Sequence, residues 1–278
     1  MSGLASVSVV IPCFRADATI ERAVASVLGQ TLPAEEILLV DDGNPPDSAA
    51  LLAALAARTP RARLLSLRQN RGAGSARNAG WAEARGRYLA FLDSDDVWHP
   101  RKLELQVGAM DERGPAVVAS GHRVVVLRAA PDTFFATVVP DGPEVTALSS
   151  RAVLVINPFA TPTLMVRRDC PVRFREGMRH TEDHALLMDL CVRGLELVRI
   201  EAPLAALFKP SLSGRGLSSE LWEMERGELE AYRNLREEKR IGAGAHAALS
   251  TLSLVKFVRR VLLVRVVQKL WRSPDGVS

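Results

Sequence analysis

Cysteine is scarce in this 278-residue chain, which contains only Cys13, Cys170 and Cys191. An odd number of widely spaced cysteines favours neither a disulfide framework nor a clustered zinc site. The start of the chain also lacks the positively charged leader and the long apolar run of a signal peptide. We therefore expect a protein that is not exported and that works in the cytoplasm or at the cytoplasmic face of the inner membrane.

Acidic residues are absent from residues 256–272, where six basic residues occur: Lys256, Arg259, Arg260, Arg265, Lys269 and Arg272. The formal net charge of the whole chain is +4, so the rest of the chain has a net charge of −2. A basic charge confined to one segment argues against nucleic-acid binding by the main body. It predicts instead a local anionic partner for the C-terminal segment.

Short apolar runs alternate with helical patterns through the first third of the chain. Strands are predicted at residues 7–11, 37–40, 64–67 and 88–92, with helices through residues 20–28, 51–57 and 76–85 between them. A repeated strand–helix order is typical of a mainly parallel, Rossmann-like sheet with helices on both faces. The sequence therefore predicts an α/β fold.

The pattern becomes less regular after about residue 115. Edge strands are predicted at residues 117–127 and 133–139, and two further strands at 195–200 and 204–208. A Gly- and Ser-rich stretch at 211–219 indicates a mobile loop or lid, and the remaining residues are predicted to be helical. We expect one domain over residues 1–210 and a C-terminal appendage, a lid loop and a basic helical segment, over residues 211–278.

Acidic side chains follow two of the predicted strands. Asp42 comes after the strand at 37–40, and Asp93, Asp95 and Asp96 come after the strand at 88–92. Ligands of open α/β sheets bind at the carboxyl ends of the strands, so one crevice could collect these acids. Three neighbouring carboxylates repel one another unless a cation or solvent relieves the charge, and oxygen ligands suit Mg²⁺ or Mn²⁺. The alternative is that the acids cap a helix that begins near Pro100.

A loop with two glycines, Gly72 and Gly74, precedes the third predicted helix. Its backbone N–H groups could approach a phosphate, and Arg71 and Arg77 add positive charge beside it. A tight turn explains two glycines equally well, because the spacing matches neither the dinucleotide fingerprint nor the P-loop.

Glu182 and Asp183 lie at the start of another helical pattern, where acidic residues are also favoured by the helix dipole alone. His180 and His184 are four residues apart and invite a metal interpretation, but the zinc-protease spacing and a third ligand are missing. His184, beside Asp183, could instead contact an acceptor.

Five motifs together resemble the family 2 inverting glycosyltransferases with the GT-A fold, in order and spacing, from residue 6 to about 210. They are Val7-Ser-Val-Val-Ile-Pro12, Val40-Asp-Asp-Gly43, Asn70-Arg-Gly-Ala-Gly-Ser-Ala-Arg-Asn78, Phe91-Leu-Asp-Ser-Asp-Asp96 and Glu182-Asp183.

The resemblance implies a role for each matching residue. Asp183 resembles the catalytic base and Asp42 the carboxylate that recognises the nucleobase. Asp93 and Asp95 resemble the Asp-x-Asp motif, which contacts the donor and Mn²⁺ or Mg²⁺. The remaining implied contacts are to the donor by Pro12, Phe14, Arg71, Arg77 and Lys209, and to the acceptor by Glu182 and His184.

Two positions depart from the family pattern. Arg15 stands where family members often have Asn, and residues 208–211 lack the histidine of an aromatic-Arg-x-His pattern near the lid. Lys209 could still meet the donor diphosphate as a point charge.

The expected activity is inverting transfer of a sugar from a nucleoside diphosphate sugar, a UDP-sugar being favoured, to a glycan or lipid-linked acceptor during cell-surface glycan or glycolipid synthesis. A nucleotidyltransferase and a non-catalytic nucleotide-binding scaffold are the alternatives. Residues 255–272 are expected to lie on a membrane surface, although the basic residues fall on no single helix face, and a packing helix or a homodimer contact would also explain them.

Overall fold

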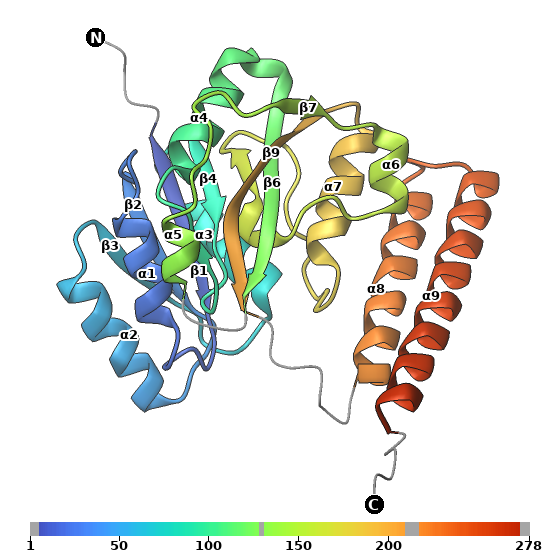
Figure 1. Ribbon diagram of the computed structural model, residues 1–278, viewed down its shortest axis with the longest axis horizontal. Coiled ribbons are helices and arrows are strands. Elements are labelled where there is room, and N and C mark those ends of the chain that lie inside the picture. Colours follow the sequence, from blue (N-terminus) through green and yellow to red (C-terminus); the bar gives the residue numbers. More distant parts are fainter. Residues whose placement is uncertain (1–5, 128–130, 209–216, 273–278) are drawn as a thin grey trace, which may run out of the picture. The chain divides into compact units, whose positions relative to one another are not determined.

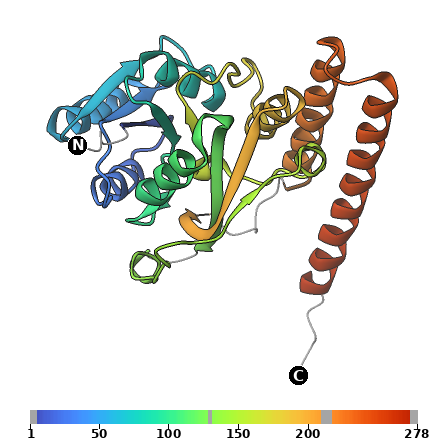
Figure 2. The same cartoon turned by 90° about the horizontal axis from the view of Figure 1, so that it is seen from above.

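The computed structural model describes residues 6–127, 131–208 and 217–272. Contacts divide the chain into two compact units, Met1–Ser211 and Leu212–Ser278. The first unit is a mixed sheet with helices on both faces, and the second is a helical hairpin (Figures 1 and 2). The α/β fold expected from the sequence is confirmed.

Four parallel strands form one half of the sheet, in the order β3 (Ala62–Ser66), β2 (Glu36–Asp41), β1 (Val7–Cys13) and β4 (Tyr88–Phe91). Every residue of β1, β2 and β4 is buried, as expected for strands covered on both faces. Because these strands run in the same direction, their carboxyl ends lie along one edge, which is where the predicted acids follow.

The sheet continues from β4 through β8 (Met165–Arg167), β6 (Val117–Leu127), β9 (Glu196–Phe208) and β5 (Val97–Trp98), and β7 (Val145–Ala147) also pairs with β9. Strands β8, β5 and β7 pair antiparallel with their neighbours, whereas β6 and β9 are parallel. The later part of the sheet is therefore mixed.

Helices α1 (Ile20–Leu28), α2 (Pro46–Arg58) and α4 (Lys102–Glu112) pack on one face of the sheet. Helices α3 (Ala73–Glu83), α6 (Ser150–Val155) and α7 (Glu182–Val192) pack on the other face. The approach of α3 is close, because a Cβ added at Gly80 would lie 2.4 Å from a methyl carbon of Val10. A short helix, α5 (Asp132–Phe135), and two 3₁₀ turns, Gly114–Ala116 and Thr161–Thr163, complete this unit.

One predicted strand is wrong, and two others are parts of one strand. Residues 133–139 form the short helix α5 and a loop, since Pro131 starts the helix and Phe134 packs on Val97 and Ala206. The strands predicted at 195–200 and 204–208 are the single strand β9. Pro203 lies opposite Arg123, where the pairing register with β6 shifts, so a proline that cannot donate to the ladder is accommodated in an irregularity without ending the strand.

The second unit contains α8 (Leu217–Glu237) and α9 (Ala243–Arg272). The two helices follow one another through a short connection and contact each other along their length (Figure 1). The helical character predicted for the C-terminal residues is therefore observed. The predicted loop at 211–219 lies outside the described residues as far as residue 216, and α8 begins at Leu217.

Candidate active site

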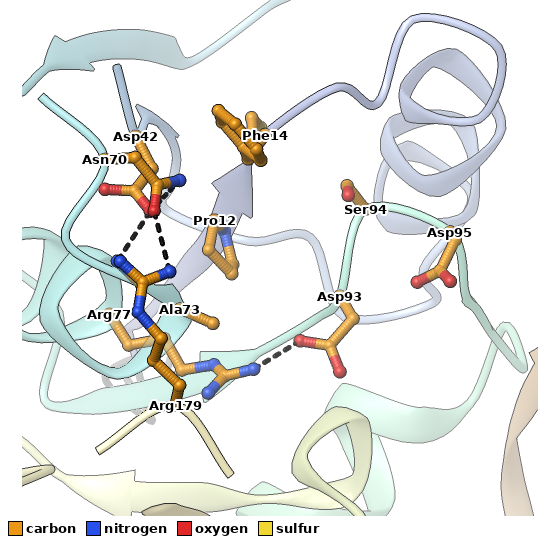
Figure 3. Close-up of a pocket in the computed structure, with 12 residues that line it drawn as sticks. Pro12, Phe14, Asp42, Asn70, Ala73, Arg77, Asp93, Ser94, Asp95 and Arg179 are labelled. Carbon is orange, nitrogen blue, oxygen red and sulfur yellow. Dashed lines mark hydrogen bonds and ion pairs between the residues drawn. The ribbon is translucent and has the colours of Figure 1, made fainter. Parts of the chain in front are cut away.

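A pocket of about 390 Å³ lies at the carboxyl ends of β1, β2 and β4 (Figure 3). The residues that line it are Pro12, Cys13, Phe14, Asp42, Asn70, Gly72, Ala73, Arg77, Asp93, Ser94, Asp95 and Arg179. Six of the predicted site residues are in this list: Pro12, Phe14, Asp42, Arg77, Asp93 and Asp95. The parallel sheet thus brings together residues that are up to 83 positions apart in the chain.

Asp42 is buried and holds the glycine loop in place. Its carboxylate accepts hydrogen bonds from the Asn70 side-chain amide at 3.0 Å and from the backbone N–H groups of Arg71 and Gly72 at 2.8 and 2.9 Å. The turn after Asp42 requires glycine, because Gly43 has φ +72° and a Cβ there would lie 2.5 Å from the backbone of Asn70. Asp42 therefore shapes the pocket wall, and little of its acceptor capacity remains for a nucleobase.

The acids after β4 have different surroundings. Burial, and then the charge of Asp93, raise the pKa of Asp95. Burial, followed by the charges of Asp93 and Asp95, raises the pKa of Asp96 to about 8. Asp96 is not among the residues that line the pocket, and it accepts the backbone N–H of Phe208 at 3.1 Å, at the end of β9. None of these acids makes a capping hydrogen bond to α4, whose N-cap is Arg101.

The carboxylates of Asp93 and Asp95 fit a hard divalent cation. Both line the same pocket, and their mutual repulsion is relieved only in part by neighbouring arginines. Among the described residues, no cluster of three or more His, Cys, Asp or Glu side chains forms a complete metal site. Mg²⁺ characteristically takes one or two carboxylates and completes its shell with phosphate oxygens and water, which matches this incomplete set.

Arg77 joins two acidic motifs from different parts of the chain. Its side chain is only 3% exposed and forms ion pairs with Asp93 at 2.6 Å and with Glu182 at 2.8 Å. Burial alone would lower the pKa of Arg77, but the charges of Asp93 and Glu182 raise it above its usual range. Both terminal nitrogens are therefore occupied by the protein, so Arg77 connects the end of β4 with the start of α7 in addition to lining the pocket.

Asp183 lies in the first turn of α7 and is held by residues from a separate loop. Oδ2 accepts hydrogen bonds from the Asn157 amide at 3.1 Å and from the Thr161 hydroxyl at 3.3 Å. Burial, followed by the charge of Glu182, raises the pKa of Asp183 to about 6. Oδ1 also accepts the backbone N–H of His184 at 2.7 Å. Asp183 therefore also interacts with the start of α7, as expected if the acid were present only to stabilise the helix. Asp183 does not line the pocket but is joined to it through Glu182 and Arg77.

The surroundings of two predicted residues, His184 and Arg71, differ from expectation. His184 is buried, and its Nε2 lies 2.6 Å from the Val153 carbonyl oxygen, so its ring connects α7 to α6 and this burial argues against acceptor contact. The Arg71 side chain pairs with Glu176 at 2.8 Å and is absent from the pocket lining. Lys209 lies outside the described residues.

Arg179 lines the pocket but was not predicted to do so. Its guanidinium donates to the Asn70 side-chain oxygen at 3.1 Å, and Asn70 in turn contacts Asp42 (Figure 3). No carboxylate pairs with Arg179 in the part of the chain that the structure describes, so its positive charge is not neutralised by a protein partner. Arg179 comes from an irregular loop, where neither periodicity nor a motif marks a side chain that turns toward the sheet.

Comparison with known proteins identifies the family. The family described as Glycosyl transferase family 2 matches residues 8–131. The chain is 30% identical to the putative teichuronic acid biosynthesis glycosyltransferase TuaG of Bacillus subtilis over 231 residues, which cover 82% of this chain and 88% of TuaG.

Two further relatives are similar over shorter regions. The succinoglycan biosynthesis protein ExoO of Rhizobium meliloti is 40% identical over 44% of this chain, and this match spans 34% of ExoO. The Escherichia coli β-1,3-glucosyltransferase WfgD, named for UDP-Glc and α-D-GlcNAc-diphosphoundecaprenol, is 34% identical over 43% of this chain and 46% of WfgD.

The fold resembles that of S. aureus TarS residues 1–349, with a TM-score of 0.62 and 18% identity over 90% of this chain and 70% of the TarS chain. The same part of TarS has been solved in complex with UDP-GlcNAc. The likeness to TarS concerns the fold, whereas the match to TuaG extends along most of both sequences. The chain belongs to glycosyl transferase family 2.

Proposed function

We propose that the chain is an inverting glycosyltransferase that moves a sugar from a nucleoside diphosphate sugar to an acceptor hydroxyl in the synthesis of a cell-surface glycan or glycolipid. The observation that carries the proposal is the connection of two acidic motifs through Arg77, with Asp93 and Asp95 on the pocket side and Glu182 and Asp183 on the other. This arrangement separates the residues suited to a donor diphosphate from the residue suited to an acceptor proton.

The donor would occupy the pocket at the edge of the sheet. Phe14 is 41% exposed there and offers a ring face to a nucleobase, near Pro12 and Asp42. The guanidinium of Arg179, which has no carboxylate partner in the described part of the chain, suits an anionic phosphate. WfgD is named for a UDP-Glc donor and TarS has been solved with UDP-GlcNAc, and both support a UDP-sugar as donor.

Asp95 and Asp93 would hold Mn²⁺ or Mg²⁺ together with the donor phosphates. When bound, such an ion supplies positive charge against the negative charge that develops on the departing diphosphate. Of the pocket cations, Arg77 is already paired with two carboxylates, which leaves Arg179 to provide uncompensated positive charge from the protein itself.

Asp183 would act as the general base. The acceptor oxygen attacks the anomeric carbon, the bond from that carbon to the diphosphate oxygen breaks, and the hydroxyl proton passes to Asp183. A single displacement inverts the anomeric configuration. Asn157 and Thr161 both contact Oδ2 of Asp183, and so orient the carboxylate for this proton transfer.

The pH dependence of transfer follows from the raised pKa of Asp183, which is about 6. Only the ionised carboxylate accepts a proton, so kcat/KM is expected to fall about tenfold for each pH unit below this pKa and to level off above it. The measurement is the initial rate at low substrate concentration from about pH 4.5 to about pH 8, a range that extends to both sides of the Asp183 pKa. The ionic strength of the buffers is held constant. A profile that stays flat down to pH 5 would exclude Asp183 as the titrating base.

The proposed function is tested by a donor screen. The protein is incubated with Mn²⁺ and each of a panel of UDP-, GDP-, CDP- and dTDP-sugars, and nucleotide release is measured with and without membrane lipid extracts as a source of acceptor. We expect release of UDP from one or a few UDP-sugars. A parallel incubation contains a nucleoside triphosphate and a sugar phosphate, and release of pyrophosphate there would instead identify a nucleotidyltransferase. Binding without any turnover in either incubation would support a scaffold.

A further inference from the structure

The side of α9 that faces α8 carries buried polar groups. Ser253, which is fully buried, donates a hydrogen bond to Glu225 at 2.8 Å, and Lys256 pairs with Glu228 at 2.8 Å. Phe257 of α9 also packs against Trp222 of α8, with ring centroids 5.6 Å apart. The two helices of this unit are therefore joined by a hydrogen bond, an ion pair and an aromatic contact.

The opposite side of α9 is apolar and exposed. We define the outer stripe as Leu252, Val255, Val258 and Leu262, whose exposed fractions lie between 41% and 60%. Their spacing of three and four residues places them on one face of the helix. Leu254 and Leu263, which are also exposed, flank this stripe. The usual pattern of a water-soluble helix is thus reversed in part, because Ser253 and Lys256 face the neighbouring helix while the aliphatic side chains of the outer stripe face outward.

A continuous exposed aliphatic stripe indicates a binding surface rather than ordinary solvent contact. Among the described residues, no helix combines the length and hydropathy needed to pass through a bilayer. The candidates are a membrane surface and a second copy of this chain.

The charge of the segment decides between them. Residues 256–272 contain no acidic residue, and of their basic residues with described side chains only Lys256 and Arg260 meet acidic groups of α8, so two copies of α9 joined through the stripe would bring like charges such as Arg259 together. Arg259 is exposed next to the stripe, and in the sequence Arg265 and Lys269 follow Val258 and Leu262 by seven residues, about two helical turns. Basic residues beside an aliphatic face suit anionic lipid headgroups above an acyl-chain boundary.

The contacts of α9 also explain why the basic residues fall on no single face. Lys256 is paired with Glu228, and Arg260 is half-buried on the same side near Glu225. These two residues belong to the junction with α8, which leaves Arg259 as the exposed basic residue among the described side chains of residues 251–263. The membrane contact expected from composition would therefore involve only the exposed face of α9.

We propose that the outer stripe of α9 binds the surface of an anionic lipid bilayer, with the helix lying in the plane of the interface. The aliphatic side chains enter the boundary between headgroups and acyl chains, and the neighbouring basic residues contact anionic headgroups. The proposal concerns attachment and does not depend on the identity of the transferred sugar.

The test is flotation of the full-length protein with vesicles of phosphatidylcholine alone or mixed with phosphatidylglycerol. The test variant is Val255→Gln/Val258→Gln/Leu262→Gln. The matched control is Val138→Gln/Ile156→Gln, which removes exposed aliphatic side chains from the first unit, where these residues are 91% and 64% exposed. We expect the unchanged protein and the control to float with mixed vesicles, at least about tenfold less of the triple variant to do so, and salt to weaken the attachment.

Several results would overturn the proposal. They are equal flotation of the triple variant and the unchanged protein, no flotation of the unchanged protein, or equal attachment to phosphatidylcholine alone. Light scattering without lipid distinguishes the other occupant, because a dimer that the triple variant converts to a monomer would assign the stripe to self-association. Circular dichroism checks that the triple variant keeps its helices. If the triple variant loses them, the effect of lipid charge and salt on flotation of the unchanged protein still decides the outcome.

Discussion

Replacement of Asp183 by Asn is expected to lower kcat for sugar transfer by between about 10²-fold and 10⁴-fold, the range that general bases contribute. Asn keeps the size of the side chain but cannot accept the acceptor proton. Asp183 lies outside the lining of the donor pocket, so the affinity for UDP should change little. The measurements are steady-state transfer kinetics and calorimetric titration with UDP.

The matched control for this variant is Asp141→Asn, which removes a carboxylate that is 99% exposed. It should leave kcat unchanged. Because Asn157 and Thr161 both contact Asp183, a thermal unfolding midpoint close to that of the unchanged protein is needed to attribute the loss to chemistry. Full transfer activity of Asp183→Asn would remove this residue from the mechanism.

Replacement of Arg77 by Met is expected to lower the free energy of unfolding by about 3–5 kcal/mol, the usual cost of leaving a buried charge without its partner. Asp93 and Glu182 would both lose the cation that neutralises them, at 2.6 and 2.8 Å. The separation between the donor pocket and α7 would no longer be fixed, so the KM for donor should also rise. Urea unfolding and donor titration measure the two effects.

The comparison variant is Arg58→Met, which removes an arginine from an ion pair with Glu21 whose two side chains are both more than 60% exposed. Exposed pairs contribute about 0–1 kcal/mol, so this change should be small. Arg77→Lys should fall between the two, because an ammonium group cannot present two parallel nitrogens to separate carboxylates. Equal stability of Arg77→Met and Arg58→Met would mean that Arg77 does not join the acidic motifs.

The parallel half of the sheet could be predicted from sequence because its signals are local. Continuous apolar runs such as residues 7–11 mark strands buried on both faces, and the direction of such strands places Asp42 and Asp93 at one edge. The shared pocket was therefore predictable from the positions of acids at strand ends, without knowledge of any contact.

The later half of the sheet was harder to predict because tertiary contacts decide its elements. β8 has only three residues and pairs with both β4 and β6, and nothing in so short a run distinguishes it from a loop. The residues between the two predicted strands at 195–200 and 204–208 include Pro203, and the pairing with the long strand β6 continues through them as the single strand β9. The apolar residues near Phe134 suggested a strand, whereas they cover one side of β5 and β9.

The directions of individual side chains in the site and in α9 could not be predicted from the sequence. His184 and Asp183 are adjacent in the chain, but the turn of α7 directs one toward Val153 and the other toward Asn157. Arg179 enters the pocket from an irregular loop that has no periodic pattern. The outer stripe of α9 could be identified only once Ser253 and Lys256 were seen to face α8.

Asp93 and Asp95 are proposed to complete, with a divalent cation, a diphosphate site at the carboxyl ends of β1, β2 and β4. Calorimetric titration of UDP in the presence of Mn²⁺ or EDTA tests it most directly, with Asp95→Asn as the variant. We predict that Mn²⁺ tightens UDP binding at least about tenfold and that Asp95→Asn removes most of this gain, since the loss of even an outer-shell partner of a metal ligand typically costs about 10–100-fold in metal affinity. UDP affinity that is the same in Mn²⁺ and EDTA, or a gain that Asp95→Asn leaves intact, would contradict the account.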